Sequence, residues 1–424
     1  MLRTNILILS FFQSFTLTLY ERGIYFFLDE RFGFTTAENL WVAVLYGVVY
    51  IGGALGSHPV AMRLGEKPTA LGLSGGAVVL GIALTLSPTV AAVLIAVPLI
   101  AVMYGGSWPV YQSYLAAGLT GGDVRRAMGR FNLTWAVAVP LGVAASGPLI
   151  SGSPRLLFLA AAGSTLVVLA LAMTLRKRPA HLPHDHPDRP PAEERAKLRR
   201  HLASMRWAMM GSFTLLFLIT PMLPEILRGR LGLGLIAATG MAASIDAARV
   251  AAFVVMQWTS RWRGSVAVVV ATVLAIPVGF YAVLLSGELG VVLAGALLFG
   301  ATNGVVYFAG LYYAMELKNA SVDAGGQHEG LVGVSLSLGP GMGLLSRGLT
   351  PIWGATGGIL AATGPLVAGC AFLGLWPLMR RREPGPAPPV SVPEPATVMA
   401  KRAPGAEADA QAEAASSTKQ PLSE

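Results

Sequence analysis

Two pairs of oppositely charged residues lie inside long apolar stretches of this sequence. Asp246 and Arg249 stand in AASIDAARVAAF (242–253), with no other charged residue between Arg230 and Arg261. A spacing of three residues brings two side chains together on a helix. The pair therefore predicts one of two things: an ion pair that stabilises helix packing, or a functional pair. In the functional alternative Asp246 accepts a proton, and Arg249 is its switchable partner or binds a substrate anion.

Glu21 and Arg22 form the second pair, in YERGIYFF (20–27). Neighbouring residues on a helix point about 100° apart, so these two do not simply pair with each other. We expect at least one of them to find a partner on another helix. The structural alternative is a salt bridge between helices or extension of the side chain to the membrane interface. The functional alternative gives Glu21 a role in proton coupling and Arg22 a role in substrate binding.

Polar and aromatic residues at related places in two later segments could line a binding cavity, because they offer stacking faces and hydrogen-bonding groups. The candidates are Trp108, Tyr111, Gln112, Asn303 and Tyr307. We expect some of them to face a cavity and the others to be packing residues. Asn132 and Trp135 have the same two alternatives.

These residues all lie within segments suited to a membrane. The chain is 54% hydrophobic and only 12% charged, with a mean hydropathy of +0.61, whereas soluble domains are roughly 25% charged. A helix of about 20 apolar residues crosses a bilayer, and the continuous apolar runs here exclude the alternating pattern of a membrane barrel. We predict an all-α polytopic membrane protein with twelve transmembrane helices. Their expected ranges are 4–28, 39–62, 69–87, 90–118, 131–152, 155–175, 207–227, 234–258, 265–286, 290–315, 329–349 and 355–379.

A polar cytoplasmic linker, 176–206, is expected to separate two six-helix bundles, 1–175 and 207–380. Residues 381–424 are rich in Pro, Ala and Glu and predict a disordered cytoplasmic tail.

The linker contains two further patterns. PAEERAKLRRHL (191–202) predicts a short basic helix lying along the membrane surface. HLPHDHPD (181–188) offers three imidazoles and two carboxylates, which suit either weak metal binding or a solvated linker. We expect this segment to be a solvated linker that binds no metal, and we expect no other cofactor.

The two halves of the chain repeat each other at an offset of about 200 residues. RFGF (31–34) matches RLGL (230–233), and Pro140 matches Pro340. Because each half has an even number of helices, the halves should have the same orientation, related by an axis along the membrane normal.

The net charge of +9 follows the predicted topology. Basic residues concentrate in the loops on the side that holds the linker and both termini, and such loops are normally cytoplasmic. We therefore expect cytoplasmic termini, contacts with lipid headgroups and no nucleic-acid partner. The Ala-, Gly- and Arg-rich composition favours a bacterial cytoplasmic membrane.

Twelve helices in a six-plus-six repeat with a basic central loop resemble the major facilitator superfamily. HPVAMRLGEK (58–67) keeps Arg63, Gly65 and Lys67 of that family's loop motif between helices two and three, although Met62 stands at its usual Asp. The resemblance implies the family's fold and a transport function. Because of this departure we do not expect the motif's cytoplasmic charge lock in this chain.

Two shorter resemblances bear on substrate and direction. SGPLISG (146–152) and GPGMG (339–343) are similar to the family's Gly-Pro-x-x-Gly motif, which in helix five is associated with exporters. YERGIYFF resembles the Glu-x-x-Glu-Arg-Phe-x-Tyr-Tyr motif of proton-coupled peptide transporters, matching at Glu21, Arg22 and Tyr25. The match adds Tyr25 to the candidate substrate residues.

We expect a monomeric secondary active transporter that moves a small organic solute by alternating access, coupled to protons, with export favoured over import. The sequence lacks the Gly-x-x-x-x-Gly-Lys-Ser/Thr loop of ATP-driven proteins. An alternative is a receptor or assembly protein that uses a transporter fold without net flux. A membrane enzyme is disfavoured, because no helix carries a His-rich or paired-carboxylate set.

Overall fold

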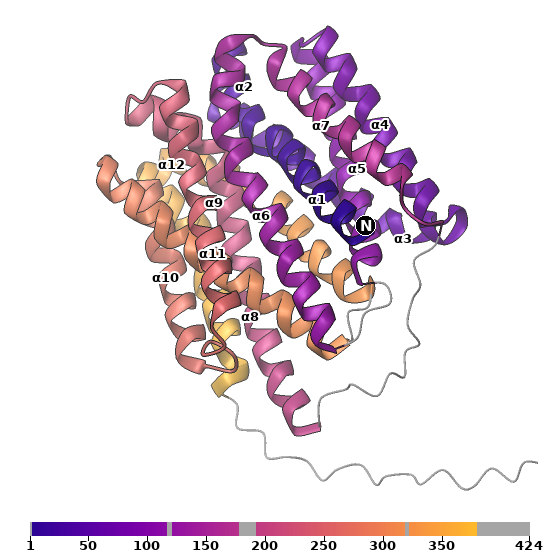
Figure 1. Ribbon diagram of the computed structural model, residues 1–424. Helices are drawn as coiled ribbons and strands as arrows, with labels where there is room; N and C mark the ends of the chain where they lie inside the picture. The colour runs from indigo at the N-terminus through magenta and orange to yellow at the C-terminus, as the bar shows by residue number, and fades with distance from the viewer. Residues whose placement is uncertain (1, 117–120, 178–191, 319–321, 380–424) are drawn as a thin grey trace, which may run out of the picture. The chain divides into compact units, whose positions relative to one another are not determined.

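The computed structural model describes residues 2–116, 121–177, 192–318 and 322–379, and every element in these ranges is a helix (Figure 1). Ten of the described helices are long and apolar enough to cross a membrane. The elements in chain order are α1 (Leu2–Thr18), η1 (Leu19–Gly23), α2 (Ile24–Phe32), α3 (Thr36–Leu64), α4 (Glu66–Leu86), α5 (Val90–Ala116), α6 (Gly121–Gly152), α7 (Leu156–Met173), α8 (Ala192–Ile219), η2 (Thr220–Met222), η3 (Glu225–Arg230), α9 (Leu235–Trp258), α10 (Val266–Leu285), α11 (Leu289–Lys318) and α12 (Val322–Met379).

The twelve predicted membrane helices all have counterparts, which confirms the all-α fold. The first comprises α1, η1 and α2 together. The last two lie within α12, where Gly354 adopts φ 69° and interrupts the helical backbone. Only glycine takes such a left-handed conformation readily, so this residue marks the turn between the two predicted helices.

Several boundaries differ from the prediction. Residues 192–202, which we expected to form a separate helix along the membrane surface, are instead the first turns of α8. α6 also begins earlier than predicted, at Gly121, and α12 begins at Val322. Hydropathy marks only the part of a helix that lies within the apolar layer of a membrane, so it assigns such polar extensions to loops. The metal-binding alternative at 181–188 and the predicted tail at 381–424 lie outside the described residues.

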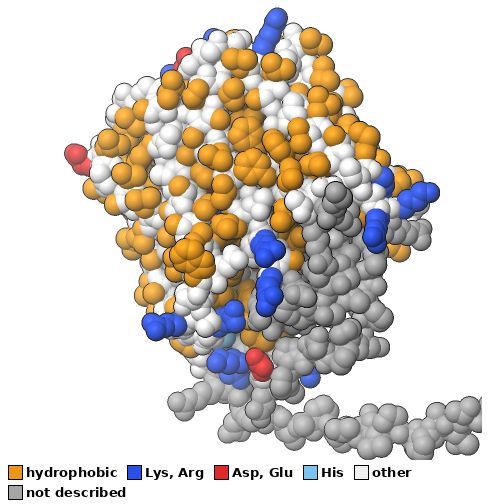
Figure 2. Space-filling model, in the orientation of Figure 1, with side chains coloured by type: hydrophobic (Ala, Val, Ile, Leu, Met, Phe, Trp, Pro, Cys, Tyr) orange, Lys and Arg blue, Asp and Glu red, His pale blue; other side chains and the backbone are white. Residues whose placement is uncertain are grey.

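The visible face of the molecule is apolar over much of its area, and most of its Lys and Arg side chains lie in the lower half (Figure 2). Exposed large apolar residues are spread over many helices, for example Leu55, Val79, Ile95 and Val278. Such a surface would be unfavourable in water. It is what a helix bundle presents to lipid.

Close packing joins helices within and between the two halves of the sequence. α3 packs on α5, and α9 packs on α11. A Cβ added at Gly53 would lie 2.2 Å from the carbonyl oxygen of Val102, and one at Gly300 only 1.9 Å from that of Ile245. Across the halves, α6 packs on α9 and α3 on α12. Glycine thus permits the close helix contacts that membrane bundles use.

The repeat predicted from the sequence has a counterpart in the backbone. Gly33 in RFGF and Gly232 in RLGL both adopt left-handed conformations, with φ of 65° and 67°. Gly65 and Gly264 are a second pair at the same offset, with φ of 91° and 64°. Corresponding turns in the two halves therefore use glycine for the same steric reason.

One end of the bundle carries ion pairs between the two halves. Arg228 of η3 pairs with Asp29 of α2, and its second terminal nitrogen lies 2.5 Å from Glu30. Glu225 of η3 accepts a hydrogen bond from the Thr36 hydroxyl. We call the group Asp29, Glu30, Thr36, Glu225 and Arg228 the end latch. Its residues also line a hollow at this end of the bundle.

Candidate functional site

Three charged side chains meet in the middle of the bundle. Asp246 of α9 forms an ion pair with Arg22 of η1, and its other oxygen lies 2.7 Å from Arg249 Nη2. Asp246 is fully buried, and the two arginines are 6% and 3% exposed. The carboxylate thus joins a residue of the first half to a residue of the second, as a buried charge requires a partner.

A π-helical turn positions Arg22. Residues 19–23 form η1, a single wide turn between α1 and α2. Such turns re-aim side chains and are frequent at functional sites. The π-helix η3 has the same relation to the end latch, since it carries Glu225 and Arg228. Both segments therefore direct charged groups of one half toward the other.

Arg249 has an aromatic contact in addition to Asp246. Its guanidinium carbon lies 5.4 Å from the centre of the Trp135 ring. The same ring packs edge-on against Tyr307, with centroids 5.1 Å apart. A guanidinium over an aromatic face is stabilised by the ring's negative face. α6, α9 and α11 therefore position one cation together.

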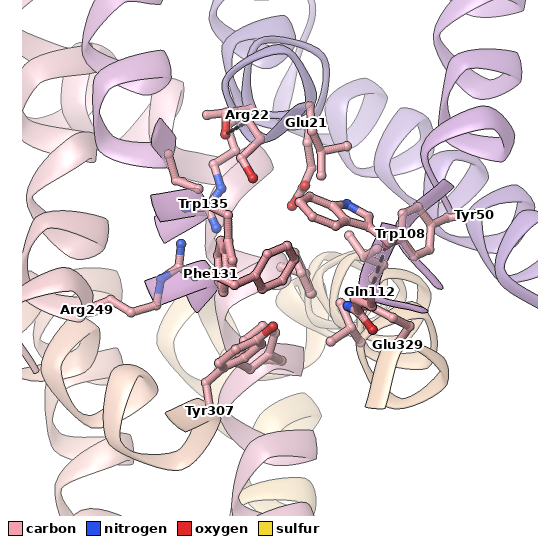
Figure 3. Close-up of a pocket in the computed structure, with 18 residues that line it drawn as sticks. Glu21, Arg22, Tyr50, Trp108, Gln112, Phe131, Trp135, Arg249, Tyr307 and Glu329 are labelled. Atoms are coloured by element: carbon pink, nitrogen blue, oxygen red, sulfur yellow. Dashed lines mark hydrogen bonds between the residues drawn. The ribbon is translucent and has the colours of Figure 1, made fainter. Parts of the chain in front are cut away.

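These residues border a cavity whose lining combines aromatic rings with a few polar and charged groups, as binding sites for small organic molecules do. In Figure 3, Arg22, Arg249 and Trp135 lie on one side of it, and Tyr50, Trp108, Gln112 and Glu329 lie on the other. The lining residues are Ser14, Leu17, Thr18, Glu21, Arg22, Tyr50, Trp108, Gln112, Phe131, Trp135, Val139, Phe213, Phe217, Arg249, Tyr307, Glu329, Val332 and Leu336.

The two halves contribute to the cavity from equivalent positions. Four pairs of lining residues stand at the offset of 199 that relates the glycine turns: Ser14 and Phe213, Thr18 and Phe217, Tyr50 and Arg249, and Trp108 and Tyr307. The cavity therefore lies where the repeated halves meet, the usual place of a transporter site. Glu21 and Arg22 have no charged counterpart, since the same offset leads to Thr220 and Pro221.

Glu329 is a buried carboxylate that accepts hydrogen bonds from two neutral side chains. Its Oε2 accepts a hydrogen bond from the Tyr50 hydroxyl at 3.2 Å, and its Oε1 accepts one from Gln112 Nε2 at 2.9 Å. Within the described ranges no Lys, Arg or His side chain forms an ion pair with it, and it is 6% exposed. The predicted helix 329–349 begins at this residue. Because α12 starts at Val322, Glu329 lies two turns inside the helix.

Glu21 differs from both other carboxylates. It is half-buried, lines the cavity, and has no hydrogen-bond or ion-pair partner among the residues that the structure describes. Adjacent Arg22 is turned to Asp246 instead, as the expected angle between neighbouring side chains requires.

The predicted site residues fall into two groups. Glu21, Arg22, Trp108, Gln112, Arg249 and Tyr307 line the cavity, and Asp246 lies behind the two arginines. Tyr25 is buried, Tyr111 shares a hydrogen bond of 2.7 Å with Ser74, and Asn303 donates to Ser212 at 3.0 Å. This second group packs within single halves, away from the cavity lining.

The predicted loop motif lies between α3 and α4. Gly65 provides the turn with its φ of 91°, and Lys67 Nζ lies 2.6 Å from the carbonyl oxygen of Met173, at the end of α7. Arg63 is exposed. The segment thus ties α4 to α7 within one half.

Sequence reasoning did not select several lining residues, among them Tyr50, Phe131, Phe213 and Phe217. A single aromatic residue in an apolar helix has no feature that separates cavity from packing positions. The repeat offset could have found one of them, because Tyr50 corresponds to the predicted site residue Arg249.

Comparison with known proteins agrees with this geometry. The sequence profile described as Major Facilitator Superfamily matches residues 6–326. No curated protein sequence shows a significant match to the chain. Among solved structures, the nucleoside transporter NupG is similar, with a TM-score of 0.62 and 13% identity over 90% of this chain and 100% of that one.

Two further structures have the same fold. The human organic anion transporter MFSD10 (TETRAN) gives a TM-score of 0.59 and 17% identity, covering 88% of this chain and 98% of its own. A bacterial homologue of the human lysosomal transporter Spinster, in an inward-facing and unoccupied conformation, gives a TM-score of 0.59 and 17% identity. The match covers 89% of this chain and 92% of that one. At these identities the likeness concerns the fold.

The fold and the family match define a multi-pass membrane transporter. The chain belongs to the Major Facilitator Superfamily.

Proposed function

We propose that this transporter moves a small organic solute by alternating access, coupled to protons, with the cavity as its binding site. The observation that carries the proposal is the cavity itself: it lies between the two halves, and equivalent positions of both halves line it. A site at this place becomes accessible from either side when the halves tilt against each other.

Glu21 is the proposed site of proton binding. It faces the cavity and has no cationic partner within the described ranges, so a proton can join or leave it without breaking an ion pair. Asp246 has a different proposed role. Its carboxylate is held between Arg22 and Arg249 and compensates their charge while the two halves are in contact.

The end latch is the proposed outer gate. The distribution of basic residues favours cytoplasmic termini, and on that topology α2 ends and α3 begins at the outer side. Ion pairs and a hydrogen bond join the halves at this end. The segment SGPLISG in α6, which resembles the Gly-Pro-x-x-Gly motif but has Ser151 at the position of its second Gly, favours export as the physiological direction.

The test is reconstitution into liposomes with an imposed pH gradient and a screen of radiolabelled organic solutes. Wild-type protein should accumulate a solute against its gradient. Glu21→Gln should keep downhill exchange of that solute and lose accumulation driven by protons. The matched control is Glu288→Gln, the same substitution at an exposed loop residue. Accumulation by Glu21→Gln at the wild-type level would overturn the proton role.

A further inference from the structure

The charges around the cavity are divided between its two sides. Arg22 and Arg249 share the single carboxylate of Asp246, so this side carries one positive charge more than negative. Arginine remains charged in proteins. Because Asp246 lies behind the guanidiniums and does not line the cavity, a bound molecule meets an excess of positive charge here.

The opposite side carries a carboxyl group, that of Glu329. Both oxygens of Glu329 accept hydrogen bonds, from Tyr50 and Gln112. Acceptance at both oxygens is the pattern of an ionised carboxylate, and the described residues provide no ion-pair partner for it. A buried charge without a partner is unfavourable, so a cationic group of a bound molecule would be stabilised beside it.

Aromatic rings lie between the two sides. Phe131 stands in the centre of the view in Figure 3, and its ring packs edge-on against Trp108 at 5.9 Å. Tyr307 stacks on Phe213 at 5.7 Å and contacts Trp135. These rings form an apolar wall that suits a flat or apolar body.

We propose that the cavity takes a zwitterion, a solute whose anionic group binds Arg249 and Arg22, whose cationic group binds Glu329, and whose apolar body packs against the aromatic rings. The inference rests on the proposed function, because it assumes that the cavity is the solute site and that Glu21 is protonated when the solute binds. With Glu21 protonated, two arginines face two carboxylates, Asp246 and Glu329. The site is then neutral but has two poles, as the solute has.

Three probes with one body test this charge pattern. They are 4-(aminomethyl)benzoate as the zwitterion, 4-methylbenzoate as the anion and 4-methylbenzylamine as the cation. The para arrangement holds the two charged groups on opposite sides of one ring. Isothermal titration of the full-length protein in detergent, without any gradient, measures the affinity for each. The zwitterion should bind at least about tenfold more tightly than either singly charged probe.

Variants assign the two poles. Glu329→Gln keeps an acceptor for Tyr50 and should lower the affinity for the zwitterion to that for 4-methylbenzoate. Arg249→Gln leaves the Arg22–Asp246 pair intact. This variant should bind the zwitterion with an affinity close to that for 4-methylbenzylamine. The matched controls, Glu288→Gln and Arg155→Gln, change exposed residues away from the cavity and should bind all probes as wild type does.

Three results would overturn the inference: no binding of any probe, a singly charged probe bound as tightly as the zwitterion, or an unchanged probe ranking in both cavity variants. The proposed function fails separately. If the zwitterion binds but a pH gradient never drives its accumulation, the inference stands and proton coupling is wrong. If a gradient drives uptake of 4-methylbenzoate as readily as of the zwitterion, the transporter proposal stands and the zwitterion is wrong.

Discussion

Arg22 and Asp246 form an ion pair although 224 residues separate them in the chain. The contact joins the first membrane helix to α9 and therefore bridges the two halves. Arg249, one turn further along α9, binds the other oxygen of the same carboxylate. One acidic group thus compensates two cations, and removing it has different consequences from removing either arginine.

Asp246→Asn should destabilise the protein more than Arg249→Gln or Arg22→Gln. The first change leaves two buried guanidiniums without a carboxylate, whereas each arginine substitution leaves one neutral pair. Breaking a buried pair by removing one partner costs about 3–5 kcal/mol, and we expect Asp246→Asn to fall in that range. Thermal unfolding in detergent measures the order of the three variants.

The double variant Asp246→Asn/Arg249→Gln is the control for this prediction. It leaves one uncompensated guanidinium in place of two, so it should be more stable than Asp246→Asn alone. Equal stability of Asp246→Asn and Arg249→Gln would show that the shared carboxylate does not balance the cluster.

Glu21→Gln should make transport insensitive to an imposed pH gradient while solute exchange continues. The side chain faces the cavity without an ion-pair partner in the described parts of the chain, so its substitution removes a proton site and leaves the Arg22–Asp246–Arg249 contacts intact. The measurement compares counterflow with uptake driven by the gradient in the same liposomes. Loss of both activities would assign Glu21 to solute binding instead.

The fold was predictable because hydropathy reports directly on membrane helices, and the glycine turns at Gly33 and Gly232 gave the repeat offset. The pair Asp246 and Arg249 was also predictable, since i,i+3 spacing is local. The partner of Arg22 was not, because a single sequence does not contain the rotation of α9 relative to α1. Glu329 was misplaced for a related reason: polar residues before it hid the early start of α12.

The end latch should control access to the buried residue Asn39, which lines the same hollow as the latch residues. Arg228→Gln removes the ion pairs to Asp29 and Glu30. Exposed or partly exposed pairs each contribute roughly 0.2–1 kcal/mol, so the loss of both pairs should increase the population of the open end by about two- to thirtyfold. The readout is the labelling rate of a cysteine placed by Asn39→Cys, a buried residue that lines the hollow. A Cys370→Ala background removes the single natural cysteine.

Arg155→Gln is the matched control for the latch. Arg155 precedes α7, near the same end of the bundle, and is exposed, so its substitution removes a positive charge without removing a contact between the halves. Its labelling rate should equal that of the Asn39→Cys parent. If Arg228→Gln and Arg155→Gln accelerate labelling equally, local charge explains the effect and the latch does not.

Gly300→Ala should separate α9 from α11 and disturb the charge cluster. A Cβ at this position would lie 1.9 Å from the carbonyl oxygen of Ile245, the residue before Asp246. Backbone atoms cannot move aside as a side-chain end can, so α9 must shift, at a cost of about 1–3 kcal/mol.

Gly240→Ala in α9 is the control, because no atom lies within 4 Å of its added Cβ, and alanine there favours the helix by up to about 1 kcal/mol. Thermal unfolding in detergent should show that Gly300→Ala is less stable than wild type and that Gly240→Ala is at least as stable as wild type. The reverse order would mean that close packing of α9 on α11 does not hold Asp246 in place.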